Sequence, residues 1–185
     1  MEKRDKNGLT EKEFLKAYAG KNYPRPYLTA DIVVFSENPG RVLLVKRRGH
    51  PFLGQWALPG GFADARESLL ETALRELREE TGIGDLPAES LEEVGIFSRP
   101  GRDPRGWVVS GAYTATVQAD GVSLAAGDDA EDTAWFGVGF DENKNLVLSR
   151  PNLRLSVSDL AFDHGEILTA ALKKYIYKRK EWIYV

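Results

Sequence analysis

The sequence predicts a mixed α/β sandwich, in which helices pack on a β-sheet. Segments with the β-branched, alternating pattern of strands occur before and after a strongly helical stretch at residues 67–81. A second amphipathic helix is expected at residues 160–178. Strands on both sides of a central helix form a stable layer when they share one sheet that the helices cover. Periodicity leaves the order of the strands in that sheet open.

Residues 1–26 are expected to form a short helix followed by an extended segment. Thr10, with Glu13 three positions later, has the spacing of a capping box, which marks a helix N-terminus. The helix is expected to end near Gly20, since glycine is common just after the last helical turn. Two prolines within residues 22–26 exclude regular helix from the segment that follows.

The remaining elements follow from turn residues and from the period of the apolar positions. Glycines and prolines mark residues 47–61 as a loop that holds a short strand at 56–58. Gly82 is the expected stop of the central helix. Residues 99–106 and 125–132 are expected to be loops. The other strands are expected at residues 28–36, 41–46, 92–98, 107–118, 133–138, 145–149 and 153–158, and hairpins should join the first two and the last two.

The composition is that of a soluble globular protein with one domain spanning residues 1–185. Hydrophobic residues make up 42% of the chain and charged residues 29%, and the length suffices to bury a core. The net charge of −3 argues against general nucleic-acid binding through a basic surface. No apolar run approaches the roughly eighteen residues of a membrane span, and the chain has neither a secretory signal pattern nor a cysteine. We therefore expect a cytoplasmic protein without membrane contact.

Three glutamates in the central helix point to metal chemistry. Glu76, Glu79 and Glu80 stand at i, i+3 and i+4, so helical geometry places them on one face. Adjacent anions repel one another, and Mg²⁺, which prefers carboxylate and phosphate oxygens, removes that repulsion when it binds them. By composition alone, a solvated acidic face is the alternative. The apolar stripe that should be buried consists of Leu70, Ala73, Leu74 and Leu77.

The spacing of this motif is more specific than its composition. Five residues separate Gly61 from Glu67, and seven more precede the run Arg75-Glu76-Leu77. After one further residue comes the Glu79-Glu80 pair, and after another the Gly82-Ile83 pair. This 23-residue pattern resembles the full signature of the Nudix hydrolase family. The resemblance implies an α/β/α sandwich with a mixed β-sheet and metal-dependent hydrolysis of a pyrophosphate.

The resemblance also implies roles for the signature residues. Glu76, Glu79 and Glu80 match the metal-binding glutamates, and Gly61 would offer its backbone carbonyl to the same cation. The expected metal is Mg²⁺, with Mn²⁺ as the alternative. A bound metal neutralises the charge that grows on the bridging oxygen as the P–O bond breaks, and it makes a bound water easier to deprotonate.

The expected catalytic residues are Glu80, Glu79, Arg75 and Glu67. Glu67 and Arg75 occupy positions that usually brace the loop and orient the glutamates. Glu80 is our first choice for the general base, and Glu79 is the second. Some family members use an acid outside the signature instead. The candidates for that role here are Asp128, Asp129, Glu131 and Asp132.

Substrate contacts must come from outside the signature. Arginine forks match phosphate geometry, and arginines gather at residues 46–48 and in the loop at 99–106. Solvated surface charge is the alternative for the arginines, and core packing is the alternative for aromatic residues. The expected substrate-binding residues are Arg48, Trp56, Arg102, Asp103 and Arg105. Further candidates for base stacking are Phe52, Trp107 and Tyr113, whereas His50 and His164 are more often structural.

Longer stretches of the chain resemble the ADP-ribose pyrophosphatase branch of the family. These are YPRPYLTADIVVF, LLVKRRGHPFLGQWALPGGF, PGRDPRGWVVSGAY and LAFDHGEIL, and they look especially like Nudix domains associated with NAD metabolism. The resemblance implies hydrolysis of ADP-ribose to AMP and ribose 5-phosphate. It also suggests a homodimer, for which residues 23–27 and 182–185 are candidate contacts.

Two alternatives remain open at this point. One is a Nudix hydrolase of another nucleotide, such as NADH, a dinucleoside polyphosphate or a damaged nucleotide. The other is a non-catalytic module that senses ADP-ribose, as in related transcription regulators with a C-terminal winged helix. Only about fifteen residues follow Ala170, so we expect no such domain and no nucleic-acid partner. Those regulators also tend to lose signature residues, all of which this sequence keeps.

Overall fold

The computed structural model describes residues 2–37, 40–84, 86–118, 124 and 130–178. Their strands form one nine-stranded sheet of order β5-β6-β1-β2-β7-β8-β9, to which β3 adds beside β2 and β4 beside β1. The strands are β1 (Tyr27–Ser36), β2 (Arg41–Arg47), β3 (Trp56–Ala57), β4 (Gly60–Phe62), β5 (Glu92–Phe97), β6 (Val108–Val117), β7 (Ala130–Phe140), β8 (Leu146–Arg150) and β9 (Leu153–Ser156). The helices are α1 (Glu11–Ala19), α2 (Leu69–Thr81) and α3 (His164–Lys178), with short 3-10 turns at Ala88–Ser90 and Val157–Asp159.

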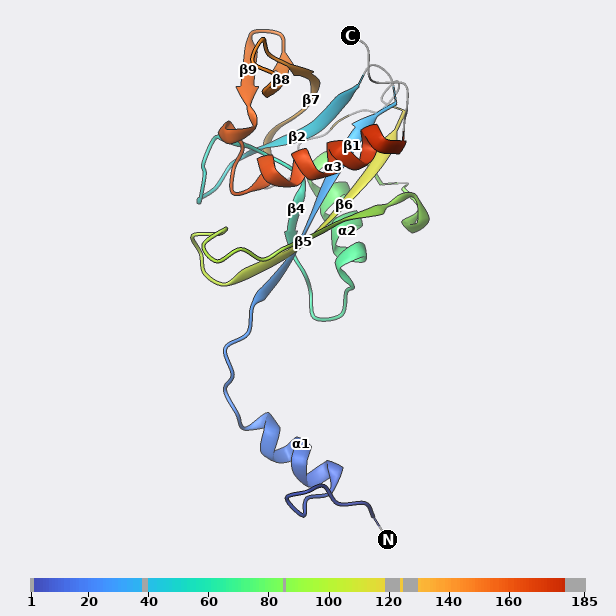
Figure 1. Ribbon diagram of the computed structural model, residues 1–185, viewed down its shortest axis with the longest axis vertical. Helices are drawn as coiled ribbons and strands as arrows, with labels where there is room; N and C mark the ends of the chain where they lie inside the picture. Colours follow the sequence, from blue (N-terminus) through green and yellow to red (C-terminus); the bar gives the residue numbers. More distant parts are fainter. Residues whose placement is uncertain (1, 38–39, 85, 119–123, 125–129, 179–185) are drawn as a thin grey trace.

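Strand β1 lies at the centre of the sandwich. It runs parallel to β6 and antiparallel to β2 and β4, so the sheet is mixed. Successive side chains of a strand point to opposite faces. Ile32 and Val34 accordingly pack with α2 on one face, whereas Val33 and Phe35 pack in the cluster that includes α3 on the other. Figure 1 shows these two helices and the sheet, and the predicted α/β sandwich is confirmed.

Helices α1 and α2 begin at side-chain caps. Thr10 and Glu13 form the expected capping box on α1. Ser68 caps α2 in the same way, so this helix begins at Leu69 rather than at residue 67. Gly82 ends it in the left-handed conformation with φ +78°. The start of α3 was predicted wrongly: it begins at His164, not at residue 160.

Two predicted loop features fall wholly or partly outside the described residues. These are the turn at 38–40 that joins the strands predicted at 28–36 and 41–46, and the acidic loop at 125–132, whose last three residues belong to β7. The tail at 182–185 also lies outside them. Within the described ranges, no helix is both long and apolar enough to cross a membrane.

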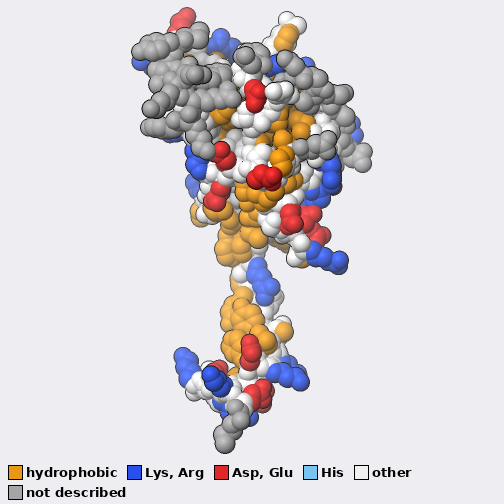
Figure 2. Space-filling view, turned by 90° about the vertical axis from the view of Figure 1, so that its right-hand side faces the viewer, with side chains coloured by type: hydrophobic (Ala, Val, Ile, Leu, Met, Phe, Trp, Pro, Cys, Tyr) orange, Lys and Arg blue, Asp and Glu red, His pale blue; other side chains and the backbone are white. Residues whose placement is uncertain are grey.

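Helix α1 stands apart from the sandwich. Figure 1 shows it at the end of an extended arm that leads into β1. None of its residues is buried, and its exposed apolar side chains are Phe14, Leu15 and Tyr18. Figure 2 shows hydrophobic side chains on α1 and where the arm joins the body. A nine-residue helix is marginal in water on its own, so this apolar face calls for a packing partner.

Candidate active site

The two glycines that open the signature lie in β4, against β1. Gly60 pairs with Asp31, and a Cβ at Gly60 would lie 2.4 Å from the carbonyl oxygen of Ala30. A Cβ at Gly61 would lie 2.4 Å from the carboxylate of Glu76. Only glycine permits such close approaches. The two glycines therefore bring the β4 backbone directly against a signature carboxylate and the central strand.

Arg75 organises the carboxylates around this backbone. Its Nε donates to both oxygens of Glu67 at 2.9 and 3.1 Å. One terminal nitrogen donates to Glu76 at 2.6 Å and to Glu79 at 3.0 Å, and the other donates to the carbonyl of Phe62 at 3.0 Å. Charge-assisted bonds of this kind are strong and directional. Arg75 thus links the loop to α2 through these hydrogen bonds.

Glu80 occupies a different environment from its neighbours. Its Oε2 accepts a hydrogen bond from the backbone N–H of Gly60 at 2.9 Å. Burial, which disfavours the charged form, raises the pKa of Glu80 to about 8, against the lowering effect of that hydrogen bond. Burial also raises the pKa of Glu76, although Arg75 opposes the change. The two half-buried carboxyl groups can therefore bind a cation or a proton.

The chemistry of this donor set fits a hard divalent cation. Among the described residues, no three acidic, histidine or cysteine side chains already converge as a metal cage. Glu76 and Glu79 are instead held by Arg75, and Glu80 is held by Gly60. All the candidate ligands are carboxylate or carbonyl oxygens, the type that Mg²⁺ and Mn²⁺ favour. The tight contact of Glu76 with Gly61 puts two of them side by side.

A cleft opens beside these residues. Three of the five predicted substrate-binding residues line it together with Glu80, namely Arg102, Asp103 and Arg105. The guanidinium of Arg105 pairs with Asp103, which is 4% exposed. Arg102 is 6% exposed and makes a bidentate pair with Asp163 at 2.8 and 2.6 Å. The cleft is lined by Thr29, Asp31, Val45, Arg47, Ala57, Leu58, Gly60, Gly61, Phe62, Glu80, Arg102, Asp103, Arg105, Phe162 and His164.

The other two predicted substrate contacts are not brought to this cleft. Arg48 is exposed in the loop after β2, and its neighbour Arg47 lines the cleft instead. Trp56 is 6% exposed in the core, where its ring meets Phe136 edge-on at 4.8 Å. Core packing is the role that the structure describes for this tryptophan. The substrate roles of both residues stay predictions.

The acids outside the signature are only partly described. Asp128, Asp129 and the side chain of Glu131 lie outside the part of the chain that the structure describes. Asp132 belongs to β7 and pairs with Arg150 at 2.9 Å. Glu80 therefore remains the first candidate for the general base, on the grounds of its place in the cleft.

A buried polar network behind the cleft was missed by sequence reasoning. Asp31, 5% exposed, accepts a hydrogen bond from Ser110, and its carboxylate lies 3.6 Å from Arg102 and 3.5 Å from Nε2 of His164. The Nδ1 of His164 accepts from the N–H of Leu58 at 2.8 Å, and burial lowers the pKa of this histidine, which favours the neutral ring. In the sequence, the one signal of this network is Asp31, an aspartate inside an otherwise apolar strand.

Comparison with known proteins defines the family. The NUDIX domain matches residues 26–151, and the chain belongs to the Nudix hydrolase family. It is 35% identical to an ADP-ribose pyrophosphatase of Methanocaldococcus jannaschii, over 90% of this chain and 83% of that protein. It is 34% identical to the ADPR responsive transcriptional repressor NtrR of Acinetobacter baylyi, over 91% of this chain. The match spans only 62% of the repressor's length.

Solved structures agree with this assignment. A MutT/nudix family protein from Enterococcus faecalis superposes with a TM-score of 0.80 at 37% identity, over 94% of this chain and 72% of that one. The NUDIX domain of Shewanella oneidensis NrtR, complexed with ADP ribose, has a TM-score of 0.70 at 32% identity, over 90% and 99%. A bifunctional NMN adenylyltransferase/ADP ribose pyrophosphatase from Francisella tularensis, complexed with AMP and Mn, has a TM-score of 0.65 at 27% identity, over 88% and 45%.

Proposed function

We propose that this protein is a divalent-metal-dependent pyrophosphohydrolase that converts ADP-ribose and water to AMP and ribose 5-phosphate. The observation that carries the proposal is the complete set of signature carboxylates, gathered by Arg75 and the glycine pair at the edge of an arginine-lined cleft. The Methanocaldococcus pyrophosphatase and the NrtR domain bound to ADP ribose support the choice of substrate.

The metal site would consist of Glu76, Glu79, Glu80 and the carbonyl of Gly61. A cation bound there supplies charge neutralisation for the pyrophosphate and lowers the pKa of a bound water. Arg75 keeps Glu76 and Glu79 oriented through its hydrogen bonds. Glu80, which lines the cleft, accepts the proton of the attacking water as general base. The oxygen of that water forms the new bond to phosphorus as the bridging P–O bond breaks.

A substrate panel with Mg²⁺ or Mn²⁺ tests this function. The panel contains ADP-ribose, NADH, a dinucleoside polyphosphate and a nucleoside triphosphate, and the products are identified by chromatography. We expect ADP-ribose to give the highest kcat/KM, with AMP and ribose 5-phosphate in equal amounts. Preference for another member would keep the chemistry and replace the substrate. A chelator should abolish turnover, and activity that survives it would refute the metal requirement.

A second candidate function is ADP-ribose sensing without catalysis. The similarity to the Acinetobacter repressor and to the NrtR domain complexed with ADP ribose favours it. It predicts ADP-ribose binding in calorimetry, with no AMP released over hours in the presence of Mg²⁺. Turnover of ADP-ribose would exclude sensing without catalysis and support the enzyme.

We also propose that the protein is a homodimer joined through α1. Phe14, Leu15 and Tyr18 are 44%, 55% and 41% exposed on this helix, and Tyr27 and Trp107 are 67% and 55% exposed where the arm meets the sheet. The prolines at 24 and 26 keep the arm extended and the helix away from its own body. A second copy offers the same apolar patches in a reciprocal arrangement.

A further inference from the structure

Phe162 has a strained backbone in the wall of the cleft. Its φ is +54°, in the left-handed region that bulky residues rarely adopt. The residues on both sides are fixed: the N–H of Ala161 donates to the carbonyl of Trp56 at 2.8 Å, and Asp163 binds Arg102 twice. Phe162 therefore cannot relax without breaking those contacts. Strain that is held in place by its surroundings often accompanies a functional position.

The ring of Phe162 lines the cleft shared with Gly61 and Glu80. Two flat cations lie near it: the guanidinium carbons of Arg47 and Arg105 are 4.9 and 5.2 Å from the ring centroid. They come from separate parts of the chain, the end of β2 and the loop before β6. The half-buried ring thus offers a π surface on which a planar group can stack.

Arg105 can leave this ring without losing its charge partner. Its guanidinium bonds both oxygens of Asp103, at distances between 2.7 and 3.2 Å. It also lies 4.6 Å from the centroid of Phe62. The contact with Phe162 is the weakest of these interactions, since cation–π attraction at a partly exposed site is small. A flat aromatic ligand can therefore replace Arg105 on the Phe162 ring.

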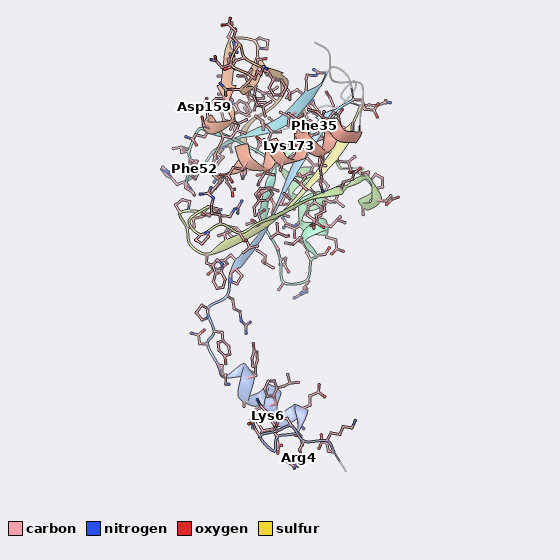
Figure 3. All side chains as sticks on the ribbon, in the orientation of Figure 1. Arg4, Lys6, Phe35, Phe52, Asp159 and Lys173 are labelled. Carbon is pink, nitrogen blue, oxygen red and sulfur yellow. The ribbon has the colours of Figure 1, made fainter. Side chains whose placement is uncertain are left out.

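We propose that Phe162 is the nucleobase platform of the cleft, and that the base stacks where Arg105 lies in this structure. The inference rests on the proposed function, because the signature carboxylates would then hold the diphosphate of the same nucleotide. It assigns the base contact to a residue that the sequence did not single out. Phe52, an earlier candidate, packs behind Phe162 with ring centroids 4.7 Å apart, and it is not among the described residues that line the cleft. Figure 3 labels Phe52, beside the start of α3.

Phe52 provides a matched control for the test. It has the same side chain and a similar strained backbone, with φ +63°, and belongs to the same aromatic pair. The variants are Phe162→Leu, Phe162→Tyr and Phe52→Leu, and Phe162→Met serves as the ring-free variant if Phe162→Leu does not fold. Calorimetry with Mg²⁺ measures the affinity of each for AMP, which carries a base, and for ribose 5-phosphate, which carries none.

We expect Phe162→Leu to weaken AMP binding by about tenfold, the order of one lost base–aromatic stack. Ribose 5-phosphate affinity should not change, Phe162→Tyr should retain AMP affinity, and Phe52→Leu should behave as wild type. Unchanged AMP affinity in the ring-free variant would overturn the inference, as would equal weakening of both ligands or an equal loss in Phe52→Leu. Absence of AMP binding by the wild type would overturn it too.

The proposed function is tested separately, by measuring ADP-ribose turnover by the wild type. If the wild type hydrolyses ADP-ribose but substitution of Phe162 leaves AMP affinity unchanged, only the inference about Phe162 is refuted. No turnover, with AMP binding that depends on Phe162, would refute the hydrolase and leave the platform standing.

Discussion

Glu80 is the residue on which catalysis should depend most steeply. Replacing it by glutamine keeps the shape of the side chain and its acceptor for the N–H of Gly60, but removes the group that takes up a proton. We expect Glu80→Gln to lower kcat by about 10²- to 10⁴-fold, the usual contribution of a general base. A steady-state assay on ADP-ribose checks this, with circular dichroism as the control for folding. Wild-type turnover in the variant would exclude Glu80 from the mechanism.

The raised pKa of Glu80 also predicts how stability depends on pH. Between the ordinary value of 4.5 and about 8, the folded protein keeps a proton that the unfolded chain releases, so stability falls as pH rises through this range. The metal-free wild type should lose about 2 kcal/mol between pH 6.5 and 8 relative to Glu80→Gln. Urea unfolding of both proteins at several pH values measures this change in the free energy of unfolding. His164, whose pKa is lowered, contributes in the opposite direction near pH 6.5, but it does so equally in both proteins and cancels in the comparison. If the unfolding free energy of the two proteins changed with pH in the same way, the raised pKa would not belong to Glu80.

Gly60 tests the close approach of β4 to β1. In Gly60→Ala the new methyl group would meet the carbonyl of Ala30 at 2.4 Å and the carboxylate of Asp31 at 2.6 Å, and backbone cannot move aside cheaply. We expect a loss of about 1–3 kcal/mol in unfolding free energy. Gly139→Ala is the matched control, because a Cβ at that strand position has no atom within 4 Å. Equal melting temperatures for the two variants would show that the strands are not so closely packed.

At the scale of the elements, α2 must both bury an apolar stripe and present carboxylates. Ala73 and Leu77 are fully buried, whereas Leu70 and Leu74 are half-buried at the edge of the stripe. Leu77→Ala should therefore cost about 2–5 kcal/mol and Leu74→Ala clearly less. Thermal unfolding of the two variants measures the difference. A larger loss for Leu74→Ala would mean that the helix is rotated from the orientation described.

Local chemistry made most elements predictable. The cap of α1 and the glycine after α2 are read from a few adjacent residues, and each lies where the pattern indicated. The cap of α2 at Ser68 was not predicted. The start of α3 was not predictable in this way. Leu160 and Ala161 are 4% and 0% exposed, which resembles a helix face in a sequence, yet Phe162 at φ +54° interrupts the backbone before His164.

The candidate site, too, was predictable from the sequence only in part. Its carboxylates could be predicted because the signature compresses them into 23 consecutive residues. The partners of the buried network are far apart: Arg102 and Asp163 are separated by 61 positions, and Leu58 and His164 by 106. No periodicity links residues at such separations. The choice of Arg47 over Arg48 as a cleft residue likewise depends on which side of a strand end each side chain leaves.

At the scale of the whole molecule, the exposed helix predicts an assembly. We expect size-exclusion chromatography with light scattering to give the mass of two chains, twice 20.6 kDa. Phe14→Glu combined with Tyr18→Glu should shift the protein to the monomer, since two charges would enter an apolar contact. Lys16→Glu, on the other side of α1, is the control and should leave the dimer intact. A monomeric wild type would refute the proposal.

The parallel pairing of β1 with β6 constrains the order in which a growing chain can acquire its shape on the ribosome. Tyr27 lies opposite Val108, so the central strand waits for 81 further residues to be synthesised before this neighbour exists. Non-local pairing of this kind is slow because a long loop must close first. The hydrogen-bond partners of Arg102 and Leu58, which are Asp163 and His164, are synthesised later still. A nascent chain can therefore carry the whole carboxylate helix and still lack these two partners until residues 163 and 164 are synthesised.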